Sequence, residues 1–322
     1  MKNNKILSLF SGCGGLDIGF HRAGFDVAVC VDNDPAACDT IRINTRWKVY
    51  EGDIALFDPA PFKGEVVGVI GGPPCQGFSP AGKGNPKDPR NFLWREYFRV
   101  VEEVQPDFIV MENVPGMLFG KYASQWGELL KKCESLGFIV SYKVLDAADF
   151  GVPQHRRRLF LIGSRIGRIE HPNGDSSSTV SVRRAICDLE DSTDAPNHTP
   201  NKHARHVVER WSKLEYGEID PKYRRGRLDP NKPSVTIRAG GGYGPSGNHL
   251  AGFHPPIHYR FPRQLTVREA ARIQGFPDSW IFEGSKTVQG RQVGNAVAPP
   301  VAEAVANQIA AAFGLRTQRE AC

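Results

Sequence analysis

One cysteine lies in a setting that suits a nucleophile. Cys75 stands in residues 71–79 (GGPPCQGFS), directly after the apolar run 66–70. Two prolines and three glycines do not belong in a packed helix or strand, so they predict a rigid loop at the carboxyl end of a strand, where α/β folds keep their sites. A structural cysteine is normally buried inside an element, and an exposed one held in such a loop therefore indicates a thiolate nucleophile.

An acid and a basic run follow further along the chain. Glu112 comes directly after the apolar residues 108–111, and burial at the end of such a strand favours the protonated form of a carboxyl group. Glu112 is therefore a candidate proton donor, with a capping or salt-bridged acid as the alternative. Residues 154–158 (QHRRR) add fixed positive charge that would hold Cys75 as thiolate and bind phosphate, unless they form an ordinary surface cluster.

A glycine-rich turn near the start of the chain is typical of nucleotide binding. Residues 10–17 (FSGCGGLD) join a strand candidate to a helix start, and glycines there let the backbone approach a ligand closely. Asp32 ends the next strand candidate, where an acid can hold a ribose hydroxyl pair, and Asp53 could accept from an adenine amino group. The spacing is not Gly-x-Gly-x-x-Gly, which favours a single adenosine-bearing cofactor over a dinucleotide. A plain tight turn is the alternative.

The elements that must position these residues alternate along the first half of the chain. Short apolar runs alternate with amphipathic stretches such as residues 92–104, which predicts an α/β fold with a doubly wound sheet. The apolar runs are residues 6–10, 27–31, 66–70, 108–111, 139–145 and 159–162. Residues 170–262 are rich in Pro, Gly, Ser, Asn and His, with strand-like pieces such as 234–238, and they predict a smaller, loop-rich domain. Helical patterning returns at 266–274 and 300–312.

The charge of the chain is unevenly distributed. Residues 1–150 hold 16 Lys and Arg against 19 Asp and Glu, whereas residues 151–265 hold 19 against 11 and also eight of the nine histidines. A basic middle segment indicates contact with a polyanion, with a solvated basic surface as the alternative. The seven cysteines form no Cys-x-x-Cys pair, so neither a zinc site nor a disulfide framework is expected. No apolar run approaches the roughly 20 residues of a membrane span, and we expect a cytoplasmic protein without a bound metal.

Together these segments resemble the DNA (cytosine-5)-methyltransferase family of the bacterial restriction-modification type. The resemblance covers nearly the whole chain outside residues 170–262 and keeps the order of the family's motifs. The matching segments are residues 10–15, 73–76, 112–114, 154–158, 263–269 and 292–297. The fold that it implies is a Rossmann-like core dependent on S-adenosylmethionine, joined to a smaller, strand-containing domain for target recognition.

The resemblance implies a mechanism in which Cys75 adds to carbon 6 of a cytosine flipped out of the duplex, so that carbon 5 can take a methyl group. It places Glu112 as the acid near N3, Arg158 against the base and Glu112, and Arg156 on a nearby phosphate. The catalytic set is Cys75, Gln76, Ser79, Glu112, Arg156 and Arg158. The set that would hold S-adenosylmethionine is Phe10, Ser11, Gly12, Gly14, Gly15, Leu16, Asp32, Asn33, Asp53, Ile54, Pro73, Leu93, Asn295 and Ala296. Asp32 stands where much of the family has glutamate, which puts its ribose contact in question.

The resemblance also implies that double-stranded DNA is the partner. Residues 79–90 could close over the DNA as a lid. Thr236 matches a position that supports the flipped nucleotide. The DNA-binding candidates are Thr236, Arg224, Arg225, Arg227, Arg238 and Lys83, with a solvent-exposed role as the alternative for each.

The expected domains are residues 1–168 for catalysis and cofactor binding, 169–284 for target recognition, and a segment 285–322 that rejoins the first domain. We expect a monomer, with a cognate restriction endonuclease encoded separately. Two other functions compete with this one. A tRNA cytosine-5 methyltransferase would carry a much smaller middle domain with a Cys-Phe-Thr element, which this sequence lacks. A catalytically inactive DNA-binding regulator would be expected to lose Cys75 or Glu112, and both are present.

Overall fold

The computed structural model describes residues 3–74, 93–177, 179–239 and 253–315. The contacts within the chain divide it into two units. The sheet unit comprises Met1–Leu145, Arg157–Asn173 and Val301–Cys322, and the loop-rich unit comprises Asp146–Arg156 and Gly174–Pro300. The chain therefore passes from the sheet unit into the loop-rich unit twice, and it ends in the sheet unit.

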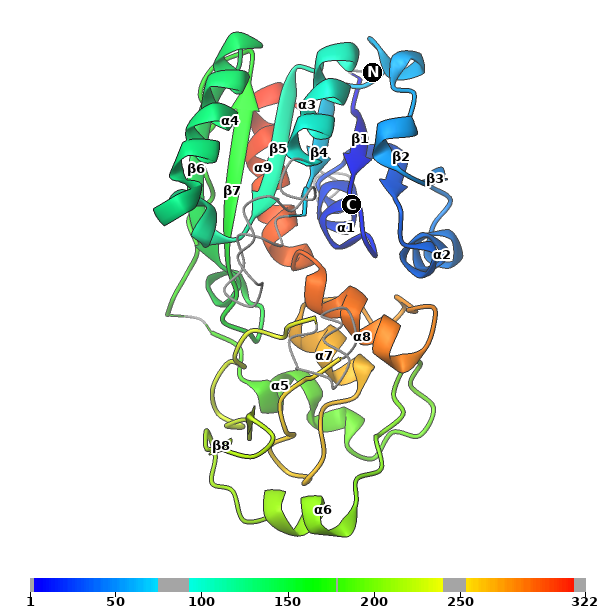
Figure 1. The fold of residues 1–322 in the computed structure, drawn as a ribbon, viewed down its shortest axis with the longest axis vertical. Coiled ribbons are helices and arrows are strands. Elements are labelled where there is room, and N and C mark those ends of the chain that lie inside the picture. Colours follow the sequence, from blue (N-terminus) through cyan, green and yellow to red (C-terminus); the bar gives the residue numbers. More distant parts are fainter. Residues whose placement is uncertain (1–2, 75–92, 178, 240–252, 316–322) are drawn as a thin grey trace. The chain divides into compact units, whose positions relative to one another are not determined.

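A seven-stranded sheet forms the centre of the sheet unit, in the order β3-β2-β1-β4-β5-β7-β6 (Figure 1). The neighbouring pairs among β1 to β5 are parallel, and β7 runs antiparallel to β5. The strands are β1 (Lys5–Leu9), β2 (Asp26–Asp32), β3 (Val49–Glu51), β4 (Gly68–Gly71), β5 (Phe108–Asn113), β6 (Ile139–Asp146) and β7 (Arg157–Ser164). Each predicted apolar run overlaps one strand, so the predicted α/β fold is confirmed. The short strand β3 was not predicted.

Helices cover both faces of this sheet. Figure 1 shows α3 and α4 in front of the sheet and α9 behind it. The helices of the sheet unit are α1 (Gly15–Arg22), α2 (Pro35–Asn44), α3 (Leu93–Val104), α4 (Ala123–Ser135) and α9 (Pro299–Phe313), the last from its third residue onward. A Cβ on Gly19 of α1 would lie 2.4 Å from the Cβ of Ala302 in α9. Glycine is required at this position because the two helices approach each other so closely.

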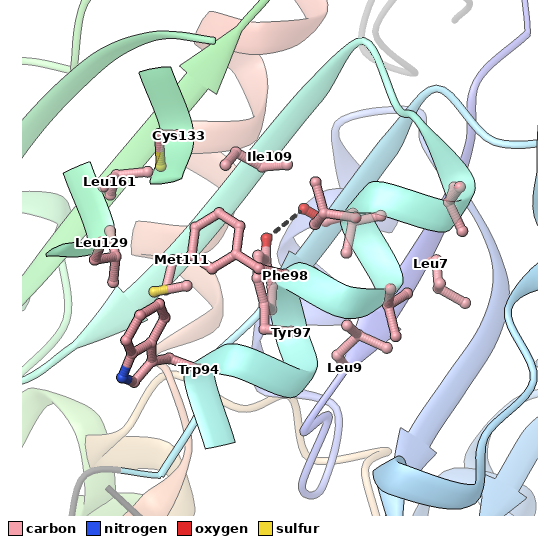
Figure 2. Close-up of a cluster of buried hydrophobic side chains, with 14 of the residues drawn as sticks. Leu7, Leu9, Trp94, Tyr97, Phe98, Ile109, Met111, Leu129, Cys133 and Leu161 are labelled. Atoms are coloured by element: carbon pink, nitrogen blue, oxygen red, sulfur yellow. Dashed lines mark hydrogen bonds between the residues drawn. The ribbon is translucent and has the colours of Figure 1, made fainter. Parts of the chain in front are cut away.

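An extensive group of buried apolar side chains lies between the sheet and helices α3 and α4. Figure 2 shows Trp94, Tyr97 and Phe98 of α3 packed with apolar side chains of the sheet. Apolar residues recur at helical spacing along α3, so one face of this helix is buried. The Tyr97 hydroxyl is buried and lies 2.9 Å from the carbonyl oxygen of Val69 and 3.0 Å from that of Val110. It thereby ties α3 to β4 and β5, the two strands whose ends lead into the predicted catalytic loops.

The loop-rich unit is built from short helices, one two-stranded hairpin and long connections. Its elements are α5 (Val182–Ile186), α6 (Arg205–Trp211), β8 (Ile219–Asp220), β9 (Arg225–Gly226), α7 (Val267–Ile273) and α8 (Lys286–Asn295). A capping box between Thr266 and Glu269 begins α7, and Arg263 donates to both carboxylate oxygens of Glu269 at 2.8 and 2.7 Å. The predicted helices at 266–274 and 300–312 correspond to α7 and α9.

The prediction of a strand at residues 234–238 was wrong. Ser234 forms one isolated bridge to Gln154, and no ladder extends from it within the described residues. The amide of Ile237 donates to the side-chain oxygen of Gln154 at 2.7 Å instead of to a neighbouring strand. The β-branched residues of this segment favour an extended backbone, but a strand also needs a partner chain beside it.

Candidate cofactor and catalytic site

The loop after β1 has an unusual backbone. Phe10, Gly12 and Gly14 all adopt positive φ angles, at 55°, 54° and 84°. A phenylalanine in the left-handed region costs on the order of 1–3 kcal/mol, which the surrounding contacts must offset. The side-chain oxygen of Ser11 lies 2.9 Å from that of Ser8, and the Ser11 amide donates to a carbonyl oxygen of β2 at 3.2 Å. The protein's own contacts therefore hold the loop in this strained conformation.

Asp32 at the end of β2 holds the same loop. One carboxylate oxygen accepts from the Gly12 amide at 2.7 Å, and the other accepts from the Asp34 amide at 2.9 Å. Burial raises the pKa of Asp32 above its ordinary value, while these two amides favour the charged form. Each carboxylate oxygen can accept a second hydrogen bond, so Asp32 can position the loop and still accept from a ribose hydroxyl.

A pocket opens at the carboxyl ends of β1, β2 and β4, at the edge where α/β folds bind ligands. Its lining residues are Phe10, Val31, Asp32, Asn33, Gly52, Asp53, Ile54, Pro74 and Leu93. Apolar side chains such as Phe10, Ile54 and Leu93 suit a purine ring, and the carboxylates of Asp32 and Asp53 suit hydroxyl and amino donors. The lining residues therefore fit an adenosine-bearing cofactor.

The structure brings together six of the residues predicted to hold the cofactor, and it places the others elsewhere. Phe10, Asp32, Asn33, Asp53, Ile54 and Leu93 line the pocket. Ser11, Gly12, Gly14, Gly15 and Leu16 form the loop and the first turn of α1 but are not among the lining residues. The pocket is lined by Pro74, whereas the carbonyl oxygen of Pro73 accepts from the Asn113 side chain at 3.3 Å. Asn295 and Ala296 belong to the loop-rich unit, and their approach to the pocket stays a prediction.

Glu112 and Arg158 form an ion pair beside the loop that follows β4. Arg158 Nε lies 3.0 Å from Glu112 Oε1, and the two side chains are only 19% and 12% exposed. The antiparallel pairing of β5 with β7 brings the end of one strand beside the start of the other, which explains the contact. A Cβ on Gly72 would lie 3.2 Å from Glu112 Oε2, so the loop after β4 passes directly over the acid. The predicted contact between Arg158 and Glu112 is present. Glu112 is thus a salt-bridged acid in this structure, and a role as proton donor requires that its carboxyl group take up a proton when the base is bound.

The predicted nucleophile follows this loop along the chain. Cys75, Gln76, Ser79 and Lys83 lie outside the described residues. The described part of the loop runs from Gly72, which faces Glu112, to Pro74, which lines the pocket and is bonded to Cys75. Sequence continuity thus joins the candidate nucleophile to the described site.

Arg156 is placed differently from its predicted phosphate contact. Its side chain is 2% exposed, and its guanidinium donates to the carbonyl oxygens of Ile237 and Gly294 at 2.9 Å each and of Asn295 at 3.4 Å. These contacts join three segments of the loop-rich unit. They favour a positioning role for Arg156 over contact with DNA.

The predicted DNA-binding residues fall into two groups. Arg224 and Arg238 are exposed, and Arg225 is half-buried beside Arg224 in the β8–β9 hairpin. Thr236 and Arg227 use their polar atoms within the unit. Thr236 Oγ1 donates to the carbonyl oxygen of His155 at 2.7 Å. The Arg227 guanidinium donates to the carbonyl oxygens of residues 214 and 259.

Sequence reasoning missed one acid behind the cofactor loop. Asp17, in the first turn of α1, is completely buried, and burial raises the pKa of its carboxyl group to about 6. Cys30 Sγ of β2 donates to Asp17 Oδ1 at 3.5 Å, and the side chain of Ser8 in β1 also bonds to this carboxyl. The one available signal was an acid between Leu16 and Ile18 on an apolar helix face. The pocket residues Val31 and Pro74 were not predicted either.

Two negative findings bear on function. In the described ranges, no three His, Cys, Asp or Glu side chains are grouped so that they could hold a metal ion. None of the helices that the structure describes is both long and apolar enough to span a membrane.

Comparisons with known proteins agree with this geometry. The model of the family described as C-5 cytosine-specific DNA methylase matches residues 4–311. Type II methyltransferase M1.HphI of Haemophilus parahaemolyticus is 38% identical, with 94% of this chain and 86% of that protein covered. Type II methyltransferase M.MthTI of Methanothermobacter thermautotrophicus is 36% identical, with 95% and 97% covered.

Solved structures extend the comparison. One, described as a DNA modification methyltransferase encoded within a prophage of E. coli, has a TM-score of 0.82 at 30% identity, with 96% of this chain and 99% of that chain covered. The crystal structure of S. pombe Dnmt2 has a TM-score of 0.69 at 20% identity, with 98% and 100% covered, and this likeness concerns the fold alone. The chain belongs to the C-5 cytosine-specific DNA methylase family and is a DNA (cytosine-5)-methyltransferase.

Proposed function

We propose that this enzyme transfers a methyl group from S-adenosylmethionine to carbon 5 of a flipped-out cytosine in a short, specific sequence of double-stranded DNA. The observation that carries the proposal is the Glu112–Arg158 pair, which lies against the loop that leads from the pocket to Cys75. The relatives named Type II methyltransferases support a place as the modification half of a restriction-modification system, with the endonuclease encoded separately.

The cofactor fits the pocket by chemistry. Phe10, Ile54 and Leu93 would enclose its purine, and Asp32 would accept from its ribose. When bound, S-adenosylmethionine supplies the electrophilic methyl group that carbon 5 receives. Asp32 also accepts from the Gly12 amide, so binding of the cofactor and order in the glycine loop depend on the same carboxylate.

The protein's own residues make carbon 5 reactive. The thiolate of Cys75 forms a bond to carbon 6, and the electron pair of the C5–C6 double bond becomes available at carbon 5. Glu112 donates to N3 and stabilises the negative charge that this addition places on the ring. Arg158 fixes the Glu112 carboxyl group and contacts the base. After methylation a base removes the proton from carbon 5, the double bond re-forms, and Cys75 leaves.

The proposal is tested by methyl transfer to two substrates. The wild-type enzyme, S-adenosylmethionine with a labelled methyl group, and either duplex DNA of random sequence or unmodified tRNA are incubated, and the methylated nucleoside is identified by mass spectrometry. We expect 5-methylcytosine in DNA. Label in tRNA alone, or on another base, would overturn the proposal.

One variant tests the role of the acid in the same assay. Glu112→Gln keeps the shape of the side chain but removes the proton, so it should bind S-adenosylmethionine normally and lose about 100-fold or more in turnover. Glu134→Gln, which changes an exposed acid of α4, is the matched control and should keep full turnover. Equal turnover in the two variants would refute the acid role of Glu112.

A further inference from the structure

A buried carboxyl group lies behind the loop between β1 and α1, residues 10–14, which we call the cofactor loop. Asp17 is completely buried, and its Oδ1 accepts from Cys30 Sγ at 3.5 Å. The Ser8 hydroxyl also bonds to this carboxyl group. Its Oδ2 is buried as well, but in the part of the chain that the structure describes it has no hydrogen-bond partner. A carboxylate offers about four acceptor sites, so the charge of an ionised Asp17 is only partly compensated by its surroundings.

A chain of hydrogen bonds joins Asp17 to the cofactor loop. Ser11 Oγ, in the loop, donates to Ser8 Oγ at 2.9 Å and lies 3.2 Å from the Ser8 carbonyl oxygen. Because Ser8 Oγ accepts from Ser11, its one proton is available to Asp17. The Ser11 carbonyl oxygen in turn accepts from the Gly14 amide at 3.0 Å, directly before α1. The charge of Asp17 therefore acts on the side-chain bonds that hold the loop.

Two ionisable groups of β2 face Asp17 and act in opposite directions. Burial is the main cause that raises the pKa of Asp17, and the like charge of Asp32 raises it further. The Cys30 thiol donates to Asp17 and lowers this pKa. On the side of α1 that packs against α9, Arg22 and Glu303 lie 3.7 Å apart, and their opposite charges largely cancel. The ionised form of Asp17 is thus disfavoured mainly because no water reaches it.

Cys13 reports the electrostatic potential inside the cofactor loop. Its thiol is buried, and burial raises its pKa well above the ordinary value. The negative charges of Asp32, Asp17 and Asp34 each raise this pKa further. The loop therefore lies in the combined negative potential of three carboxylates, and a cation bound beside it would be stabilised.

From these observations we infer that Asp17 is a positioning residue that makes the cofactor loop prefer the cationic methyl donor over its neutral product, with ionisation of Asp17 coupled to binding of the methyl donor. This inference rests on the proposed function. S-adenosylmethionine carries a sulfonium, which becomes a neutral thioether when the methyl group has left. A positive charge beside the loop supplies the compensation that Asp17 lacks, and salt screens such buried interactions only weakly.

The coupling has a definite proton balance. When the methyl donor binds, the protonated Asp17 releases its proton to solvent and the Ser8 hydroxyl donates to the resulting carboxylate. After methyl transfer the compensating charge is gone, and Asp17 takes up a proton again. By reciprocity, a higher pH favours binding of the methyl donor over binding of the product.

The test compares the Kd values of S-adenosylmethionine and S-adenosylhomocysteine for the wild-type enzyme, by calorimetric titration at half-unit steps from pH 5 to pH 7. Both ligands have the same amino and carboxyl groups, so the ratio of the two Kd values largely cancels the titration of those groups. If the methyl donor lowers the pKa of Asp17 from about 6 to roughly 5, the preference for it over the product rises about fivefold across this range. We expect a rise of this size.

Two variants assign the rise to Asp17. Asp17→Asn should make the ratio of Kd values independent of pH, whereas Asp26→Asn, which changes an exposed acid of β2, should keep the wild-type dependence. Cys30→Ser keeps the acid and gives it a hydroxyl donor, which is stronger than a thiol. It should stabilise the ionised form and move the rise to lower pH.

The outcomes separate this inference from the proposed function. A wild-type enzyme that binds neither ligand and methylates no DNA would overturn both. A wild-type enzyme that methylates DNA but shows a constant ratio from pH 5 to pH 7 would overturn the inference alone. The same holds for a rise that persists unchanged in Asp17→Asn, or for a Cys30→Ser curve that coincides with that of the wild type.

Discussion

Asp17 offers a quantitative test of how the cofactor loop is supported. Its carboxyl group is completely buried behind that loop, and burial raises its pKa from 3.8 to about 6. This rise in pKa means that the free energy of unfolding is about 3 kcal/mol larger when Asp17 is protonated than when it is ionised. Asp17→Asn replaces the titrating group with a neutral one of nearly the same shape, so it removes this contribution.

The direction in which stability changes with pH follows from proton binding to Asp17. Between about pH 4 and pH 6 the folded protein holds a proton on Asp17 that the unfolded chain has lost, so the free energy of unfolding falls as the pH rises. Well above pH 6, from about pH 7, the carboxyl group is ionised in both states, and its contribution no longer changes with pH. Relative to Asp17→Asn, the wild type should therefore lose about 2.4 kcal/mol of stability between pH 4 and pH 7, most of the full contribution.

Urea denaturation followed by circular dichroism at pH 4, 5, 6 and 7 measures this difference. Asp26→Asn, which changes an exposed acid at the start of β2, is the matched control and should follow the wild type closely. A difference between wild type and Asp17→Asn that stays constant across this range would refute the assignment of a buried, titrating carboxyl group behind the loop.

Three further substitutions test other parts of the account. Asp32→Ala removes the acceptor that holds the glycine loop, and it should weaken S-adenosylmethionine binding by about tenfold or more in a calorimetric titration, since a hydrogen bond to a charged group contributes about 1.5–3 kcal/mol; an unchanged Kd would contradict this role. Arg158→Ala should lower turnover by about 100-fold while cofactor affinity stays the same, because Glu112 loses the cation that positions it; a loss of cofactor affinity alone would indicate a different role. Gly19→Ala would place a Cβ 2.4 Å from α9 and should destabilise the protein by about 1–3 kcal/mol in urea, whereas Gly127→Ala, where a Cβ meets open space, should not.

All strands of the sheet except the short β3 were predictable, because an apolar run is a signal that lies within a few consecutive residues. The runs that form β1, β2, β4, β5 and β7 are largely buried in the core, as is usual for the inner strands of a doubly wound sheet, whereas the run at 139–145 forms the edge strand β6, in which Ile139 and Tyr142 are exposed. The antiparallel direction of β7 was not predictable in this way, since pairing depends on residues far apart in the chain. Residues 234–238 show the opposite case, in which β-branched residues favour a strand but no partner strand lies beside them in the described structure.

The residues of the candidate site also differ in how well local sequence signals predict their roles. Phe10, Asp32 and Asp53 could be predicted because turn chemistry and strand ends identify a ligand-binding edge. The surroundings of Arg156 and Arg227 could not, because a sequence shows that a residue is charged but not which carbonyl oxygens will lie around it. Both guanidinium groups are used within the loop-rich unit.

Covalent trapping tests the central claim most directly. Duplex DNA that contains 5-fluorocytosine is incubated with the enzyme and S-adenosylmethionine, and the products are separated under denaturing conditions. Fluorine at carbon 5 cannot leave as a proton does, so the enzyme should remain bonded to carbon 6. We predict a denaturation-stable protein–DNA adduct whose modified peptide contains Cys75, and no adduct with Cys75→Ala. An adduct that forms equally well with Cys75→Ala, or a wild-type enzyme that methylates ordinary DNA but gives no adduct, would contradict the proposed mechanism.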